Sequence, residues 1–143
     1  MRDVMAKKKN PSDEPVADFL RDRGCPPHIV EEGLKGLVER WEGVVESISR
    51  GYALGLDDYL NDLDGRELLE GALAVASEQE REKYRKRILR ADRRMKALVK
   101  PAGKCLWGND TAKREGWAPE KNWWYFSRPI DAGPDLLSEL GKE

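Results

Sequence analysis

The chain has 143 residues, of which 37% are charged, and its formal net charge at pH 7 is −1. This length is typical of one domain with enough chain to bury a hydrophobic core. The two cysteines, Cys25 and Cys105, are far apart and the chain has a single histidine, which argues against a Cys/His metal site. No apolar run reaches the roughly 18 residues of a membrane span, and the N-terminus carries no secretory signal. We therefore expect a reduced, cytoplasmic protein with free thiols that does not contact a membrane.

The near-zero net charge conceals a strong segregation along the chain. Residues 11–80 carry 17 acidic and 6 basic side chains, a balance of −11, whereas residues 81–104 carry 11 basic and 2 acidic ones, a balance of +9. Two interpretations fit this pattern: the basic block neutralises the acidic block inside the fold, or it contacts an anionic partner.

The first elements in chain order are a leader and a short helix. Residues 1–14 contain a lysine cluster, Asn-Pro and Ser-Asp-Glu, which predicts a disordered leader before a single helical domain over residues 15–143. Residues 15–23 predict a short helix that Gly24 ends.

Residues 28–52 carry apolar side chains at steps of three and four, which predicts the main helix of the core. Gly36 and Gly43 lie beside this apolar stripe. A glycine in an exposed helix costs about 1 kcal/mol relative to alanine. Either a second backbone packs closely there or the helix tolerates these glycines, and we favour close packing.

The middle of the chain predicts three further helices. A short helix over residues 54–64 is expected to end at Gly65, and a second over residues 66–77 is expected to be the most buried element. Ser77 then caps a long helix over residues 78–100. That helix has a narrow apolar seam, which a second copy of the chain would complete to give a homodimer; the seam consists of Tyr84, Ile88, Ala91, Met95 and Leu98.

Residues 104–143 change character, because four of the five tryptophans lie there. Residues 105–107 and 123–126 predict two short strands or extended segments, separated by turns at 108–110 and 118–119. The predicted fold is therefore all-α: an irregular bundle of four to five helices with an aromatic-rich, partly extended C-terminal segment packed across it.

The leading functional hypothesis is a small intracellular binding or regulatory protein that acts by protein–protein interaction. Tryptophan, tyrosine and arginine are the usual anchors of interfaces, although the same residues also suit the capping of an open bundle end. The candidate anchors are Trp107, Trp123, Trp124, Tyr125 and Arg128.

The alternative hypothesis is nucleic-acid binding through the basic helix. Its candidate residues form one ridge about 16 Å long, with a second ridge of Lys86, Arg93 and Lys100 beside it, and such a surface suits a phosphate backbone. The net charge of −1 argues against a dedicated nucleic-acid binder. The residues of the first ridge are Lys83, Arg87, Arg90 and Arg94.

An enzyme with a pocket under the aromatic segment is the third hypothesis. The chain contains none of the common nucleophile, nucleotide-binding or zinc-protease motifs, so no catalytic residue, cofactor or metal is assigned. The acidic run before Gly65 does not have the spacing of a calcium loop, and we interpret its carboxylates as helix caps and a solvated rim. That run comprises Asp57, Asp58, Asp62 and Asp64.

Overall fold

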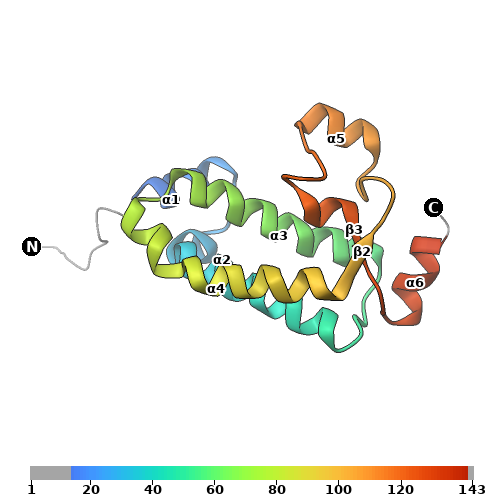
Figure 1. Cartoon of the computed structure of the whole chain (residues 1–143). Helices are drawn as coiled ribbons and strands as arrows, with labels where there is room; N and C mark the ends of the chain where they lie inside the picture. Colours follow the sequence, from blue (N-terminus) through green and yellow to red (C-terminus); the bar gives the residue numbers. More distant parts are fainter. Residues whose placement is uncertain (1–13, 142–143) are drawn as a thin grey trace, which may run out of the picture.

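The computed structural model of the chain describes residues 14–141 and confirms the all-α prediction (Figure 1). The predicted leader lies outside the described residues except for Glu14, which begins the first helix. The elements in chain order are α1 (Glu14–Asp22), α2 (Pro27–Ser49), α3 (Leu56–Val75), α4 (Glu78–Leu98), β2 (Val99–Pro101), α5 (Asn109–Glu115), the 3₁₀-helix η2 (Trp123–Phe126), β3 (Ser127–Pro129) and α6 (Pro134–Gly141).

Helix α2 is the centre of the bundle, and it packs against α1, α3 and α4. Its apolar stripe is buried as predicted, with Trp41 and Val45 at most 2% exposed. Pro27 occupies the first turn, where a missing N–H costs nothing. The helix bends at Gly33, whose φ of 62° is accessible mainly to glycine.

Helix α3 runs without interruption through Gly65, so the predicted break between two short helices is wrong. A glycine inside a helix costs only about 1 kcal/mol. The residues on either side are buried in the bundle, with Leu63 and Leu69 0% exposed and Arg66 4% exposed. Tertiary packing therefore outweighs the local preference of this glycine.

The long basic helix is confirmed as α4, and its Ser77 cap accepts a hydrogen bond from the backbone N–H of Glu80 at 3.1 Å. The narrow seam of α4 faces α2 of the same chain, since Tyr84, Ile88, Ala91 and Met95 are all at most 7% exposed. These four seam residues are therefore packed within one chain, although Ile88 also lines a groove between α3 and α4. Dimerisation stays a prediction.

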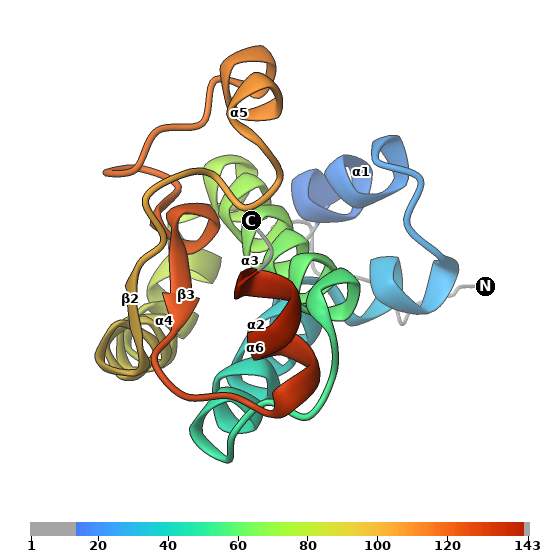
Figure 2. The same ribbon diagram turned by 90° about the vertical axis from the view of Figure 1, so that its right-hand side faces the viewer.

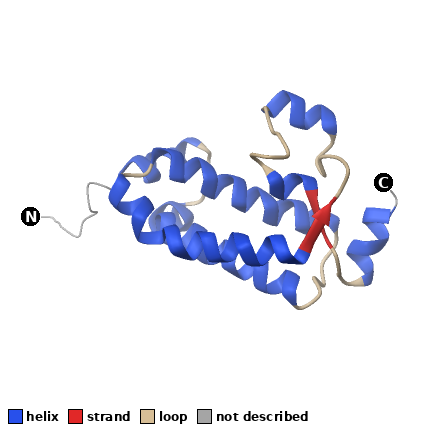
Figure 3. Ribbon diagram, in the orientation of Figure 1, coloured by secondary structure: helices blue, strands red, loops and turns tan. Residues whose placement is uncertain are grey.

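The aromatic segment packs against one end of the bundle, as expected, but its local structure differs from the predicted one (Figures 2 and 3). Residues 123–126 form a 3₁₀-helix. The strands are instead Val99–Pro101 and Ser127–Pro129, which pair antiparallel with Lys100 opposite Arg128. Trp124 and Tyr125 are both 1% exposed. Neighbouring residues of a strand point to opposite faces, whereas a helical turn brings both rings against the bundle. The predicted turn at 108–110 instead begins helix α5.

A buried ion pair joins α3 to α4. The Nε and Nη2 groups of Arg66 donate to the two carboxylate oxygens of Asp92 at 3.1 and 2.8 Å. Asp92 also accepts a hydrogen bond from the indole of Trp41 at 2.8 Å, and the guanidinium of Arg66 lies 4.3 Å from the ring centre of Trp124. Burial acts to lower the pKa of Arg66, but hydrogen bonds to Asp92 and Glu70 outweigh it and raise that pKa above its usual value.

The expected close packing at Gly43 is wrong, because a Cβ there would meet nothing within 4 Å. At Gly36 a Cβ would meet the side chain of Glu32 on the same helix and not a second backbone. The close approach occurs at Gly71, where α3 meets the ring of Phe19 on α1. Sequence periodicity identifies the apolar face of a helix but not the place where its partner comes closest.

Alanine substitutions at two helical glycines are therefore expected to change stability in opposite directions. Gly43→Ala should raise the free energy of unfolding by about 0.5–1 kcal/mol, because it removes backbone entropy from the unfolded chain without a clash. Gly71→Ala should lower it by about 1–3 kcal/mol, because the new methyl group displaces Phe19. Urea unfolding followed by circular dichroism measures both, and equal shifts for the two variants would contradict the packing described.

Loss of the Asp92 carboxylate is expected to destabilise the fold strongly. Asp92→Ala leaves a buried guanidinium and the indole N–H of Trp41 without their main partner, at a cost of about 3–5 kcal/mol. The double variant Arg66→Met, Asp92→Leu should recover most of this loss, since an apolar pair of similar volume needs no partner. Glu120→Ala, at an exposed position, serves as the control in the same urea titrations. A cost below about 1 kcal/mol for Asp92→Ala would show that the ion pair is dispensable.

Candidate partner-binding site

Two carboxylates of α3 hold the aromatic segment in place. Asp64 accepts hydrogen bonds at one oxygen from the hydroxyl of Tyr125, at 2.6 Å, and from the indole of Trp107, at 3.0 Å. Glu67 accepts one from the side-chain amide of Asn122 at 2.9 Å, and Asn122 is 2% exposed. The interpretation of Asp64 as a helix cap or a solvated rim residue is therefore wrong, because this carboxylate is a tertiary anchor.

The aromatic rings then fall into two groups. Trp117 stacks on Tyr125 with ring centres 4.0 Å apart, and Trp107 lies beside them through the shared Asp64. Trp123 instead contacts Trp124 edge to face and lies under the ammonium group of Lys96, 4.9 Å from the ring centre. The first group faces α5, and the second group faces the C-terminal end of α4.

A groove of about 840 Å³ lies along the first group of aromatic rings. Its lining residues come from α3, from α5 and its flanking segments, and from the turn between α1 and α2. The lining includes aromatic, acidic and basic side chains, and it comprises Arg23, Cys25, Asn61, Asp64, Gly65, Glu67, Leu68, Trp107, Thr111, Arg114, Glu115, Trp117 and Tyr125.

Two weakly acidic groups of the aromatic segment, the Tyr125 hydroxyl and the Cys105 thiol, are held in their neutral forms. Burial raises the pKa of Tyr125 far above its ordinary value, and the hydrogen bond to Asp64 raises it further. Burial also raises the pKa of the Cys105 thiol, which is 0% exposed. A nucleophile needs the opposite shift, so neither side chain is activated for catalysis. Among residues 14–141, no three histidine, cysteine or acidic side chains are placed to hold a metal ion.

The predicted anchors do not form one surface. Trp107 is 41% exposed and lines the groove, whereas Trp123 and Arg128 are partly buried and lie outside its lining. Trp124 and Tyr125 are each 1% exposed, and their burial reflects the bundle-capping alternative. Arg23, Arg114 and Trp117 also line the groove but were not among the predicted anchors, because the turn after α1 and the region of α5 meet only through the tertiary fold.

The first basic ridge of α4 is largely occupied by the acidic half of the chain. Arg87 donates two hydrogen bonds to the carboxylate of Glu42 at 2.7 and 3.0 Å, and Arg94 contacts Glu46 at 2.9 Å. The hydrogen bond from Arg87 lowers the pKa of Glu42. The internal neutralisation of the basic block is therefore seen directly at these two arginines, whereas nucleic-acid binding stays a prediction.

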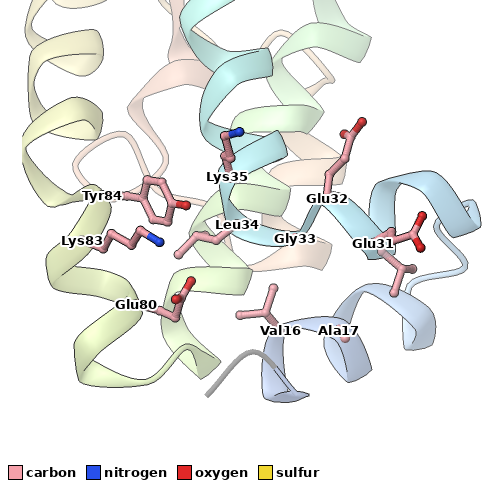
Figure 4. A pocket seen from close by; sticks show the side chains of 11 residues that line it. Val16, Ala17, Glu31, Glu32, Gly33, Leu34, Lys35, Glu80, Lys83 and Tyr84 are labelled. Carbon is pink, nitrogen blue, oxygen red and sulfur yellow. The ribbon is translucent and has the colours of Figure 1, made fainter. Parts of the chain in front are cut away.

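A second, smaller cavity of about 220 Å³ opens where α2 bends at Gly33 (Figure 4). In Figure 4 the side chains of Glu80 and Lys83 extend from α4 toward its apolar floor. Lys83, a candidate nucleic-acid contact, shares the lining of this cavity with three glutamates, and its ammonium group lies 5.6 Å from the ring centre of Tyr84. The lining comprises Val16, Ala17, Val30, Glu31, Glu32, Gly33, Leu34, Lys35, Glu80, Lys83 and Tyr84.

Charge reversal at two arginines of α4 is expected to lower the free energy of unfolding by different amounts. Arg87→Glu should lower the free energy of unfolding by about 1 kcal/mol, because it replaces a half-exposed ion pair with repulsion from Glu42. Arg93→Glu lies on the same helix, is exposed, and makes no ion pair within residues 14–141, so its effect should stay within about 0.5 kcal/mol. Chemical denaturation at physiological salt measures the difference, and equal losses would mean that the Glu42 contact contributes nothing.

In the described part of the chain, no helix combines the length and apolar character needed to cross a membrane. The chain matches no protein-family model, and no curated protein and no solved structure is significantly similar to it.

Proposed function

We propose that the chain is a small intracellular binding protein, and that its groove along α3 and α5 receives a segment of a partner protein. The observation that carries the proposal is a pair of tryptophans, Trp107 and Trp117, held in fixed positions beside an open groove of about 840 Å³.

Preorganisation is the main physical support. A side chain that must be ordered on association costs about 0.5–1.5 kcal/mol. The Trp107 indole is already held by Asp64, and the Trp117 ring is already stacked on Tyr125. A tryptophan that is 41% exposed but tethered offers apolar area without this entropic cost.

The charges in the groove favour a polar peptide over an apolar small molecule. The lining contains two cations, Arg23 from the turn after α1 and Arg114 from α5, and the carboxylates of Asp64, Glu67 and Glu115. Such a mixture of charges suits a segment with both signs of charge, arranged around an apolar residue that packs on the tryptophans.

The cytoplasmic location is part of the same proposal. Cys25 and Cys105 are both unpaired, and Cys105 is buried, so neither contributes a disulfide to the stability of the fold. Two thiols kept apart in this way are typical of a reducing compartment.

A random peptide library displayed on phage, selected against the full chain, tests the proposal. The selected peptides should bind wild type and lose at least about tenfold in affinity for Trp107→Ala, as expected of an interface anchor. They should lose less for Trp107→Phe, which keeps an aromatic ring but removes the N–H donor.

Leu54→Ala is the matched control for this selection, because Leu54 is 52% exposed and lies outside the groove lining. Its affinity for the selected peptides should equal that of wild type. Peptides that bind Trp107→Ala as tightly as wild type would place recognition elsewhere and contradict the proposal.

A further inference from the structure

A second groove, of about 310 Å³, lies between α3 and α4 and shares no lining residue with the groove of Trp107. Its apolar side chains are Leu73, Ile88 and Leu89. Helix α4 lines it from Glu78 to Asp92, a length of about 21 Å at 1.5 Å per residue. Figure 1 shows the courses of α3 and α4, the two helices whose side chains line this groove.

The depth of this groove follows from the way α3 and α4 are held apart. Helix α4 packs mainly on α2, and Trp124 of η2 lies against Arg66 of α3. The Arg66–Asp92 pair closes the inner end of the groove, where both residues line it. Toward the start of α4, Leu73 and Ile88 remain the floor of an open channel.

Leu89 is the exposed apolar residue of this channel, with 46% of its surface open. On a helix the neighbours of a residue are those three and four positions away, which for Leu89 include Arg85, Lys86 and Arg93. Lys86 and Arg93 are exposed and make no ion pair within the described residues. The apolar groove therefore has an uncompensated positive edge.

The charges that line the groove itself are already neutralised. Arg81 pairs with Glu78 at 2.9 Å, and Arg85 pairs with Glu82 at 3.2 Å. Arg81 also donates to the backbone carbonyl of Ala76 at 2.6 Å, which fixes it at the rim. The excess charge thus belongs to the outer edge of α4, where carboxylates of an incoming segment would find cations without displacing an existing partner.

We propose that the α3–α4 groove binds an acidic amphipathic helix of a partner protein. The apolar, leucine-rich face of that helix would pack on Leu73, Ile88 and Leu89. Its flanking carboxylates would contact Lys86 and Arg93. A helix of about 14 residues spans the groove, since four turns match the 21 Å of α4 that line it. The proposal concerns a different surface from the tryptophan groove, and it stands or fails independently of the function proposed above.

Fluorescence anisotropy with a defined probe tests this inference. The probe is a fluorescein-labelled peptide of about 14 residues, with leucine at helical spacing on one face and glutamate on the flanks. It should bind the full chain, and Leu89→Gln should weaken binding at least about tenfold. The double variant Lys86→Glu, Arg93→Glu should weaken it similarly and reduce its dependence on salt.

Ile130→Gln and Lys113→Glu are the matched controls, because Ile130 is 56% exposed and both residues lie outside the groove lining. Both variants should bind the probe as wild type does. Circular dichroism establishes that every variant remains folded before its affinity is compared.

Several outcomes would overturn the proposal. These are equal binding of a peptide with lysine in place of glutamate, binding that Leu89→Gln does not change, or no binding of the acidic probe. If a mixed-sequence oligonucleotide binds, and charge reversal at Lys86 and Arg93 weakens that binding while Leu89→Gln does not, the cationic edge of α4 is a nucleic-acid contact. A dimer in sedimentation that Leu89→Gln dissociates would assign the groove to a second copy of the chain.

Discussion

The structure depends on one buried ion pair, between Arg66 of α3 and Asp92 of α4. A guanidinium with a side chain 5% exposed is costly to remove from water, and the bidentate carboxylate, Glu70 and the face of Trp124 together offset that cost. Because Asp92 also accepts from Trp41 of α2, a single carboxylate fixes three helices relative to one another. Trp124 of the aromatic segment packs on the guanidinium of Arg66. The position of the aromatic segment at the end of the bundle therefore also depends on the Arg66–Asp92 pair.

The segregated charges are the second constraint, and the structure divides them between internal and external roles. Arg87 and Arg94 turn toward α2, where Glu42 and Glu46 meet them, and this neutralises part of the basic block within the chain. The opposite face of α4 keeps Lys86 and Arg93 exposed. One helix therefore has a neutralised inner flank and a cationic outer face, a division that net charge alone does not reveal.

Much of the helical core was predictable from sequence because it depends on local periodicity. The apolar stripe of α2, the Ser77 cap and the seam of α4 all appeared as expected. The failures have different causes: at Gly43 the expected contact is absent, whereas at Gly65 tertiary contacts overrode a local signal. Gly65 was expected to break α3, but its buried neighbours keep the helix intact. The candidate groove was only partly predictable, since Trp107 was named while Arg23 and Arg114 come from elements that meet only in three dimensions.

Helix α3 shows why its polar residues were the hardest part of the sequence to interpret. Asp62 accepts a hydrogen bond from Tyr52, Asp64 from Tyr125 and Trp107, and Glu67 from Asn122, while Arg66 binds Asp92. Each of these side chains holds a different part of the chain, so α3 has contacts on most of its circumference. A helix with partners on several sides has no single polar face. Its sequence then lacks the amphipathic period of a surface helix, and its polar residues are easily interpreted as solvent-exposed. The same arrangement leaves a groove on either side of α3: the tethered tryptophans border one, and Leu89 with its flanking cations borders the other.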